Sequence, residues 1–176
     1  NQIKCFSGFK ILFLQDEYEN TNESIKAIKE LKVEIVYTCV PKKYIHMVYP
    51  IKRLKNIEFI QTLTGFAAEN KFLKKMNHLP IKKRKELIGY RGNDLPFYYG
   101  DLGQEKKNIA KLMESECLKR KQKCDISYKI EKRIYGTKWV SFVQKFKATL
   151  GTESGSNLFD YDGQIKKNFL KYKDAY

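Results

Sequence analysis

The sequence predicts an α/β fold with mainly parallel sheets, because β-rich apolar runs and helix-forming segments follow one another along the chain. Its 176 residues, 42% of them hydrophobic, are enough for one domain or two partial ones. The alternation is interrupted between residues 64 and 84, where the sequence is less regular. We therefore expect a boundary near residue 80, with one unit over residues 1–80, linker included, and another over residues 81–176.

The first expected unit begins with a strand followed by a helix. Phe9–Leu14 is a continuous apolar run, which is typical of a strand buried on both faces of a parallel sheet. Asn20 and Glu23 have the spacing of a capping box and predict a helix start. The apolar face of that helix would consist of Ile25, Ile28 and Leu31. Val33–Val40, ended by a proline, and Ile57–Leu63 are the next strands expected.

The alternation resumes after the boundary. Strands are expected at Glu86–Tyr90, Asp125–Tyr128 and Ala148–Leu150, and helices over Gly103–Lys121, over Thr137–Phe146 and from Gly163 onward. Core positions of the last two helices would be Trp139, Phe142, Val143, Phe146, Ile165, Phe169 and Leu170. Helical spacing favours a structural role for these aromatic residues over a cofactor site.

Composition limits the function classes. The formal charge of +15 attracts phosphate, nucleic acid or anionic membrane, but Lys-rich coding bias would give the same value. The four cysteines are far apart and are expected to be reduced. We see no membrane span and no signal-peptide pattern, so a cytoplasmic protein is expected. A first residue other than Met and the terminus Lys-Asp-Ala-Tyr suggest a segment of a longer protein.

Three polar loops follow expected strands and should meet at one crevice, because ligands of parallel sheets bind outside the carboxyl ends of the strands. These loops are Gln15–Glu17, Arg91–Asp101 and Thr152–Asp162. The second loop opens a helix at Gly100–Lys106, and a helix start beside Arg91 and Lys106 is suited to phosphate. Alternatively, both cations are ordinary surface residues.

The stretch from Lys147 to Gly163 is rich in small, hydroxylated and acidic residues, as binding loops are. Asp160 and Asp162 in this stretch have two alternative roles: they hold a divalent cation, or they cap the helix near Gly163. A Walker sequence and a G-x-G-x-x-G motif are absent, and no hydrolase motif accompanies the histidines.

The order of several segments resembles a family of bacterial glycosyltransferases of the two-Rossmann-domain (GT-B) type. The segments are Lys10–Tyr18, Ile88–Lys106, Arg133–Trp139 and Ala148–Asn157. The resemblance covers most of residues 10–163 and is most specific after Tyr90 and around Glu153. It implies Rossmann-like parallel sheets with flanking helices. Residues 1–80 would end the N-terminal, acceptor-side domain, and residues 81–176 would form an incomplete donor-binding domain.

The function implied by the resemblance is transfer of a sugar from a nucleotide-diphosphate donor to a glycan or lipid-linked acceptor in polysaccharide or glycolipid assembly, without a cofactor. The donor-binding residues implied are Arg91, Gly92, Lys106, Glu153, Ser154, Gly155, Ser156 and Asn157. Gln15, Asp16 and Glu17 would lie on the acceptor side, and Glu153 is the candidate catalytic residue. The family's second glutamate is replaced here by Tyr161, so neither a catalytic base nor the stereochemical outcome is transferred.

Two other functions compete with this prediction: a cation-dependent sugar-nucleotide enzyme using Asp160 and Asp162, and a basic nucleic-acid-binding module. No nucleic-acid motif supports the latter. A basic cluster near the expected boundary would hold the protein against the inner face of an anionic membrane, or form a solvated linker. Its members are Lys71, Lys74, Lys75, Lys82, Lys83, Arg84 and Lys85.

Overall fold

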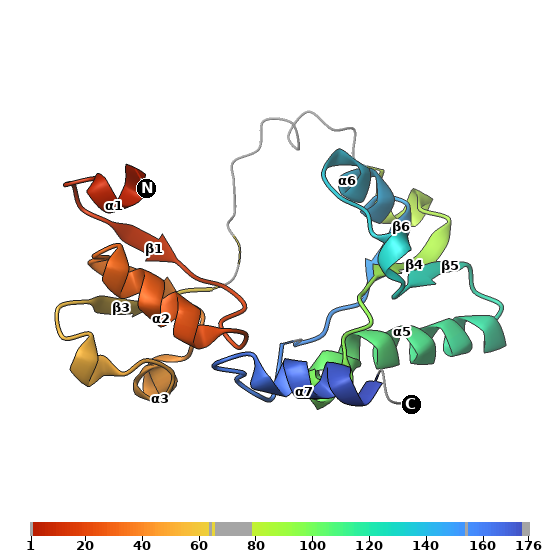
Figure 1. Ribbon diagram of the computed structural model, residues 1–176. Helices are drawn as coiled ribbons and strands as arrows, with labels where there is room; N and C mark the ends of the chain where they lie inside the picture. The colour runs from red at the N-terminus through yellow and green to blue at the C-terminus, as the bar shows by residue number, and fades with distance from the viewer. Residues whose placement is uncertain (1, 64, 66–78, 154, 174–176) are drawn as a thin grey trace. The chain divides into compact units, whose positions relative to one another are not determined.

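The computed structural model describes residues 2–63, 65, 79–153 and 155–173 and divides the chain into two compact units (Figure 1). The first unit comprises Asn1–Ala67 together with Leu158–Tyr176, and the second comprises Ala68–Asn157. Both units are α/β, and each contains one parallel three-stranded sheet with flanking helices. The expected division differs at the C-terminus, because the last 19 residues belong to the first unit.

The sheet of the first unit has the order β1-β2-β3. Its strands are β1 (Ile11–Phe13), β2 (Ile35–Thr38) and β3 (Glu58–Gln61). Parallel neighbours need a crossover connection, and α2 (Thr21–Glu30) supplies it between β1 and β2. Leu12 pairs in register with Val36, and Val36 with Phe59, so these three residues share one face of the sheet.

The core of the first unit lies on that face. It contains Ile28 of α2 and Val36 of β2, both fully buried, and extends to α3 (Ile45–Val48). The buried members are Ile28, Val33, Val36, Val40, Ile45, Val48, Tyr49 and Leu54. The stripe predicted for the first helix is confirmed, because Ile25 and Leu31 pack against this cluster.

Strand β1 differs from the expectation of burial on both faces. Ile11 and Phe13 alternate with Leu12, so they point to the opposite face, and Phe13 is 67% exposed. The Phe13 ring stacks on Tyr37, its partner in register, with 4.5 Å between centroids. The prediction that this strand is buried on both faces is wrong because α2 and α3, the helices of the core, cover the same face of this small sheet.

The start of α2 is confirmed, but the predicted capping box does not form. Asn20 adopts the left-handed conformation with φ 52° and makes no side-chain capping hydrogen bond. Thr21 stabilises the helix start instead, because its hydroxyl donates a hydrogen bond to the carbonyl of Glu17 at 2.7 Å.

The C-terminal segment joins the first unit through backbone hydrogen bonds. Asp160 N donates to Tyr18 O at 2.7 Å, and Asn20 N donates to Asp160 O at 2.8 Å. Helix α7 (Gln164–Lys173) follows, as predicted from Gly163 onward. Its residues Ile165 and Leu170 are exposed, so the expectation that they point inward is wrong for both.

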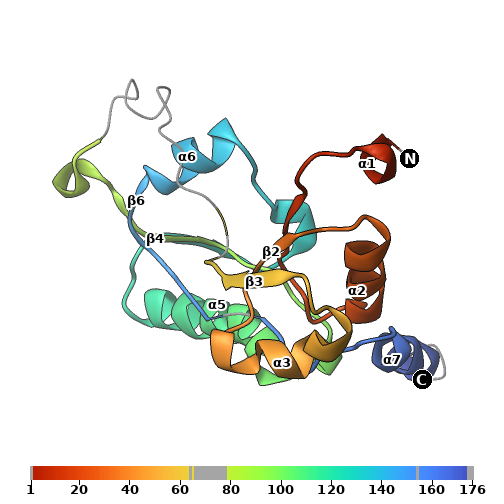
Figure 2. The same ribbon diagram turned by 90° about the vertical axis from the view of Figure 1, so that its left-hand side faces the viewer.

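The second unit is built around β4 (Glu86–Arg91), the central strand of a sheet with the order β5-β4-β6. The outer strands are β5 (Cys124–Ser127) and β6 (Phe146–Thr149). Both views place α5 (Asp101–Lys119) and α6 (Thr137–Val143) on opposite faces of this sheet (Figures 1 and 2). Gly103, Ala110 and Cys117 recur every seven residues on the buried side of α5.

Phe146 begins β6 and does not continue α6, so the predicted end of that helix is wrong. The missing side chain of Gly89 leaves room for the Phe146 ring against the central strand. The ring also lies 4.8 Å from that of Phe142, and both residues are buried. Trp139, expected in this core, is 37% exposed.

Short elements complete the two units. They are α1 (Gln2–Cys5), η1 (Lys42–Tyr44), η2 (Ile51–Arg53), η3 (Ile81–Lys83), η4 (Phe97–Tyr99) and η5 (Ile130–Lys132), η marking a 3-10 helix. All four cysteines are free thiols. Among the residues described, no helix combines the length and apolar character that crossing a bilayer requires.

Candidate functional site

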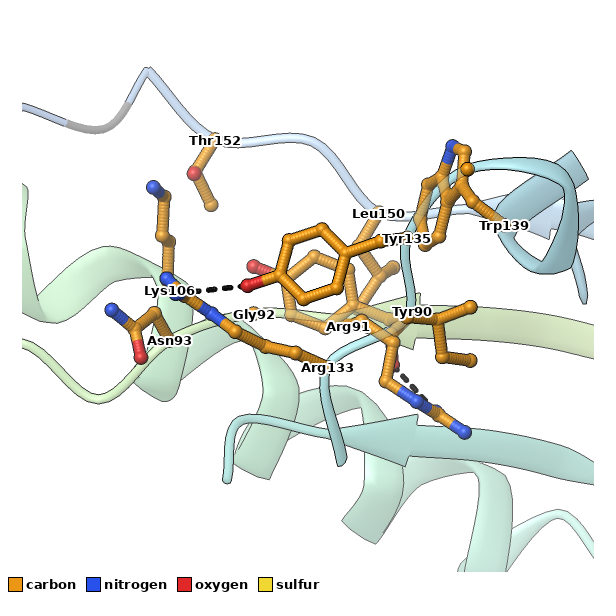
Figure 3. Close-up of a pocket in the computed structure, with 12 residues that line it drawn as sticks. Tyr90, Arg91, Gly92, Asn93, Lys106, Arg133, Tyr135, Trp139, Leu150 and Thr152 are labelled. Atoms are coloured by element: carbon orange, nitrogen blue, oxygen red, sulfur yellow. Dashed lines mark hydrogen bonds between the residues drawn. The ribbon is translucent and has the colours of Figure 1, made fainter. Parts of the chain in front are cut away.

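A pocket of about 600 Å³ opens at the carboxyl ends of β4 and β6 in the second unit (Figure 3). The chain leaves β4 toward β5 through α5, while β6 pairs on the other side of β4. This reversal of direction creates a crevice in which parallel sheets bind ligands. The pocket is lined by Tyr90, Arg91, Gly92, Asn93, Lys106, Arg133, Ile134, Tyr135, Gly136, Trp139, Leu150 and Thr152.

One end of the pocket is basic. Lys106 from α5, the guanidinium of Arg133 and Asn93 gather there (Figure 3). Arg133 donates a hydrogen bond from its Nη1 to the Tyr135 hydroxyl at 3.2 Å. Within the described part of the chain, neither Lys106 nor Arg133 forms an ion pair with a carboxylate. Both positive charges are therefore available to an anionic ligand.

The other end is aromatic. Trp139 stands there, and Tyr135 lies between it and the basic end (Figure 3). The buried Tyr90 also lines the pocket, and burial raises the pKa of its hydroxyl. Gly92 leaves this ring uncovered, because a Cβ at that position would lie 2.8 Å from it. The pocket thus offers aromatic side chains beside two cations.

Arg91 lines the pocket, but its guanidinium is engaged elsewhere. It bridges to the Asp125 carboxylate at 2.8 Å and lies 4.3 Å from the centroid of the Phe142 ring. The side chain is 11% exposed, and its buried Nε has no hydrogen-bond partner among the described residues. These contacts join the sheet to α6, so Arg91 positions the pocket wall more than it presents charge.

The start of α5, predicted as a phosphate site, is partly filled by Asn157. The Asn157 side-chain oxygen accepts from Leu102 N at 3.0 Å, and its backbone N donates to Tyr99 O at 2.9 Å. Gly103 N is also used, since it donates to Gly100 O. The predicted donor residue Asn157 therefore caps α5 and closes off part of the expected anion site.

The remaining loop residues lie beyond the pocket wall formed by Thr152. Glu153 is exposed and is not among the lining residues, Gly155 has φ 123°, and Ser156 is half-buried. Ser154, another predicted donor residue, lies outside the described residues. The structure thus brings Arg91, Gly92 and Lys106 to one pocket and leaves Glu153 at its margin.

The predicted acceptor-side residues separate into exposed and buried ones. Gln15 and Asp16 are exposed, and the Asp16 carboxylate accepts from the Tyr18 hydroxyl. Glu17 is buried and accepts from the Thr38 hydroxyl at 2.5 Å, from Cys39 N at 2.7 Å and from the Tyr49 hydroxyl. Glu17 is thus directed into the core of the first unit.

The carboxylates of Asp160 and Asp162 are used as helix caps. The two oxygens of the buried Asp160 accept from Ile165 N at 3.1 Å and Lys166 N at 2.9 Å. Asp162 accepts from Gln164 N at 3.2 Å. The capping alternative is confirmed, and no cluster of three or more metal-binding side chains occurs among the residues that the structure describes.

Arg133, Tyr135 and Trp139 are pocket residues that sequence reasoning did not select. Arg133 and Tyr135 belong to a fourth strand-end loop, which follows β5 at the same edge of the sheet, and Trp139 lies in α6 directly after that loop. Gly136, with φ 58°, marked that loop as a turn before α6. In the basic cluster, Lys71, Lys74 and Lys75 lie outside the described residues, and Arg84 donates to Leu79 O and Phe146 O.

Comparisons of the chain with protein-family models, curated proteins and solved structures find no match. The pocket contributes two positive charges, aromatic surfaces and a position at the carboxyl ends of parallel strands.

Proposed function

We propose that the protein is a glycosyltransferase of the GT-B type, with two Rossmann-like units, that moves a sugar from a nucleotide-diphosphate donor to a glycan or lipid-linked acceptor. One observation carries this proposal: Lys106 and Arg133 meet in a pocket that also contains Tyr135 and Trp139. Cations paired with aromatic surfaces suit a ligand that has both phosphate and a planar base. The volume of about 600 Å³ lies within the range of cofactor-sized sites.

The reaction would depend on stabilising the departing nucleotide diphosphate. Negative charge develops on the diphosphate as the bond to the sugar breaks, and Lys106 and Arg133 would offset that charge. Their side chains would supply this charge without a metal ion. The carboxylates of the alternative cation site, Asp160 and Asp162, are already hydrogen-bonded to the start of α7.

The loop after β6 would then face the donor sugar. Glu153 follows the pocket residue Thr152, so we assign it to the sugar side of the donor. Arg91 would act by positioning, because Asp125 and Phe142 hold its guanidinium. In the first unit, the exposed Gln15 and Asp16 remain the residues proposed for the acceptor side.

Titration calorimetry with a panel of nucleoside diphosphates tests the binding part of the proposal. Arg133→Ala and Lys106→Ala should each weaken binding about 10- to 100-fold, because each removes a charge-assisted contact worth about 1.5–3 kcal/mol. The matched controls are Arg120→Ala and Lys111→Ala: Lys111 lies in α5 and Arg120 directly follows that helix, and both are exposed cations outside the pocket. Equal binding by all four variants, or no binding of any nucleoside diphosphate at millimolar concentration, would contradict the proposal.

Transfer is tested separately with labelled sugar nucleotides and lipid-linked or glycan acceptors. Glu153→Ala should lower turnover while leaving the affinity for nucleoside diphosphate unchanged, because Glu153 does not line the pocket. Unchanged turnover would remove Glu153 from the reaction. A glycosyltransferase would still be supported if the Arg133→Ala variant lost both binding and transfer.

A further inference from the structure

The first unit carries an exposed surface in which apolar and basic side chains are combined. The basic–apolar surface consists of Lys42, Lys43, Tyr44, Met47, Ile51 and Lys52, from η1, α3 and η2. All six residues are exposed. The surface belongs to a different unit from the pocket, so the proposed function does not account for it.

The apolar members of this surface are exposed side chains of three short elements. Tyr44 of η1, Met47 of α3 and Ile51 of η2 are 44%, 64% and 39% exposed. The chain does not form one continuous helix here, because α3 ends at Val48 and Tyr49 is extended. Ile45, Val48 and Tyr49, which lie between the exposed residues in the sequence, are buried in the core of the unit. Packing within the unit therefore does not explain why the exposed positions are apolar.

Within this segment of the chain, the charged side chains have a single sign. Residues 35–57 contain no Asp or Glu, while Lys42, Lys43, Lys52 and Lys55 of this segment are all exposed. The ammonium group of Lys43 lies 4.6 Å from the centroid of the Tyr44 ring, so cation and aromatic ring are adjacent. An anionic partner would meet positive charge on either side of exposed apolar side chains.

A second acid-free basic segment lies in the same unit. The Tyr161 hydroxyl donates to the carbonyl of Met47 at 3.1 Å, which connects α3 to the chain just before α7. Residues 163–173 contain no Asp or Glu and four lysines. Figures 1 and 2 both show α3 and α7 along the lower edge of the first unit.

We infer that the basic–apolar surface docks on a bilayer containing anionic phospholipid. The negative surface potential of such a bilayer attracts each nearby lysine, and apolar side chains gain further by entering the interface. A single-stranded nucleic acid would use the same charges but would stack on flat aromatic rings. The protruding side chains Met47 and Ile51 are flexible or aliphatic, which favours lipid over nucleic acid.

Vesicle co-sedimentation of the full chain tests this inference. Binding to phosphatidylcholine vesicles is compared with binding to vesicles that also contain roughly 30% phosphatidylglycerol, an anionic lipid content that creates a negative surface potential. Binding should require the anionic lipid and weaken with salt. Lys42→Glu, Lys43→Glu and Lys52→Glu combined should lower the partition coefficient by about 100-fold or more, from about 1 kcal/mol per lysine. The charge-matched control is Lys26→Glu, Lys29→Glu and Lys147→Glu, three exposed lysines outside this surface.

Met47→Ser with Ile51→Ser separates lipid insertion from simple charge attraction. This variant keeps every lysine and should bind vesicles roughly 10-fold less tightly, because apolar side chains no longer enter the bilayer. Circular dichroism checks that each variant is folded. Equal loss in the control triple variant would overturn the inference, as would unchanged binding by Met47→Ser/Ile51→Ser or tighter binding of single-stranded DNA than of vesicles. Nucleoside diphosphate binding should persist in all these variants, so this test is independent of the pocket.

Discussion

Glu17 provides the sharpest test of how the first unit is held together. The sequence placed this carboxylate beside the acceptor, whereas the structure buries it and surrounds it with three hydrogen-bond donors. Thr38 and Cys39 belong to β2 and its end, and Tyr49 follows α3. The Glu17 side chain therefore ties the loop after β1 to two other parts of the core.

The cost of removing this carboxylate follows from its partners. Glu17→Ala leaves two buried hydroxyls and the partly buried N–H of Cys39 without an acceptor, and each unmade hydrogen bond costs about 1–3 kcal/mol. The hydroxyls of Thr38 and Tyr49 recover part of this loss by rotating, but the N–H of Cys39 does not. We expect Glu17→Ala to lower the free energy of unfolding by about 3–5 kcal/mol, and Glu17→Gln by about 1–2 kcal/mol, because the amide keeps one acceptor.

Hydrogen exchange combined with urea unfolding measures this effect unit by unit. Exchange should accelerate in β2 and α3, and the transition of the first unit by circular dichroism should move to lower urea. Fluorescence of Trp139, the only tryptophan, reports on the second unit and serves as an internal reference. Asp16→Asn is the matched control, because that carboxylate is adjacent but exposed, and its effect should stay within about 0.5 kcal/mol.

One result would refute this structural role for Glu17. If Glu17→Gln leaves unfolding and exchange at wild-type values but abolishes sugar transfer, the carboxylate belongs to the acceptor site. If Glu17 has the structural role, the stability of the first unit increases from Glu17→Ala to Glu17→Gln to wild type.

Two further predictions concern the same unit. Asp160→Ala removes the two capping hydrogen bonds that the Asp160 carboxylate accepts from α7 and should cost about 1–2 kcal/mol, with faster exchange in α7, while chelator or added Mg²⁺ leaves the melting temperature of the wild type unchanged. Burial, and then the hydrogen bond and charge of Glu17, raise the pKa of Tyr49. The unfolded tyrosine ionises near pH 10 while the folded one keeps its proton, so stability is full below about pH 10 and falls above it by about 1.4 kcal/mol per pH unit. Alkaline melting curves should show this slope, and Tyr49→Phe should reduce it.

The pattern of apolar residues along the chain predicted the positions of most strands and helices. The strand expected at Glu86–Tyr90 forms over Glu86–Arg91, and the helix expected over Gly103–Lys121 forms over Asp101–Lys119, because hydrophobic periodicity depends on neighbours along the chain. The end of α6 was misplaced, because Phe146 has helical spacing in sequence but fits beside Gly89 of β4. That fit depends on a residue more than fifty positions away, which no local pattern contains.

In the candidate site, too, the local sequence did not predict contacts between residues that are distant along the chain. Lys106 was identified from its place in a strand-end loop and helix, and the pocket does contain it. The direction of a side chain was not predictable: Arg91 turns to Asp125 and Phe142, while Arg133 takes a position at the basic end of the pocket. Choosing between two arginines requires knowing which one already has a carboxylate partner in the folded chain.

The sequence by itself determined the α/β class, the order of the strands and of the longer helices, and an excess of positive charge, since these depend on composition and on periodicity along the chain. Only the tertiary structure decided which polar side chains already form hydrogen bonds within the protein. Glu17, Asp160 and Asn157 were candidates for ligands, and each accepts hydrogen bonds from backbone N–H groups. These N–H groups lie at the start of a helix or just after a strand, where their own element offers no acceptor, and folding brings the three side chains to them before any ligand is present.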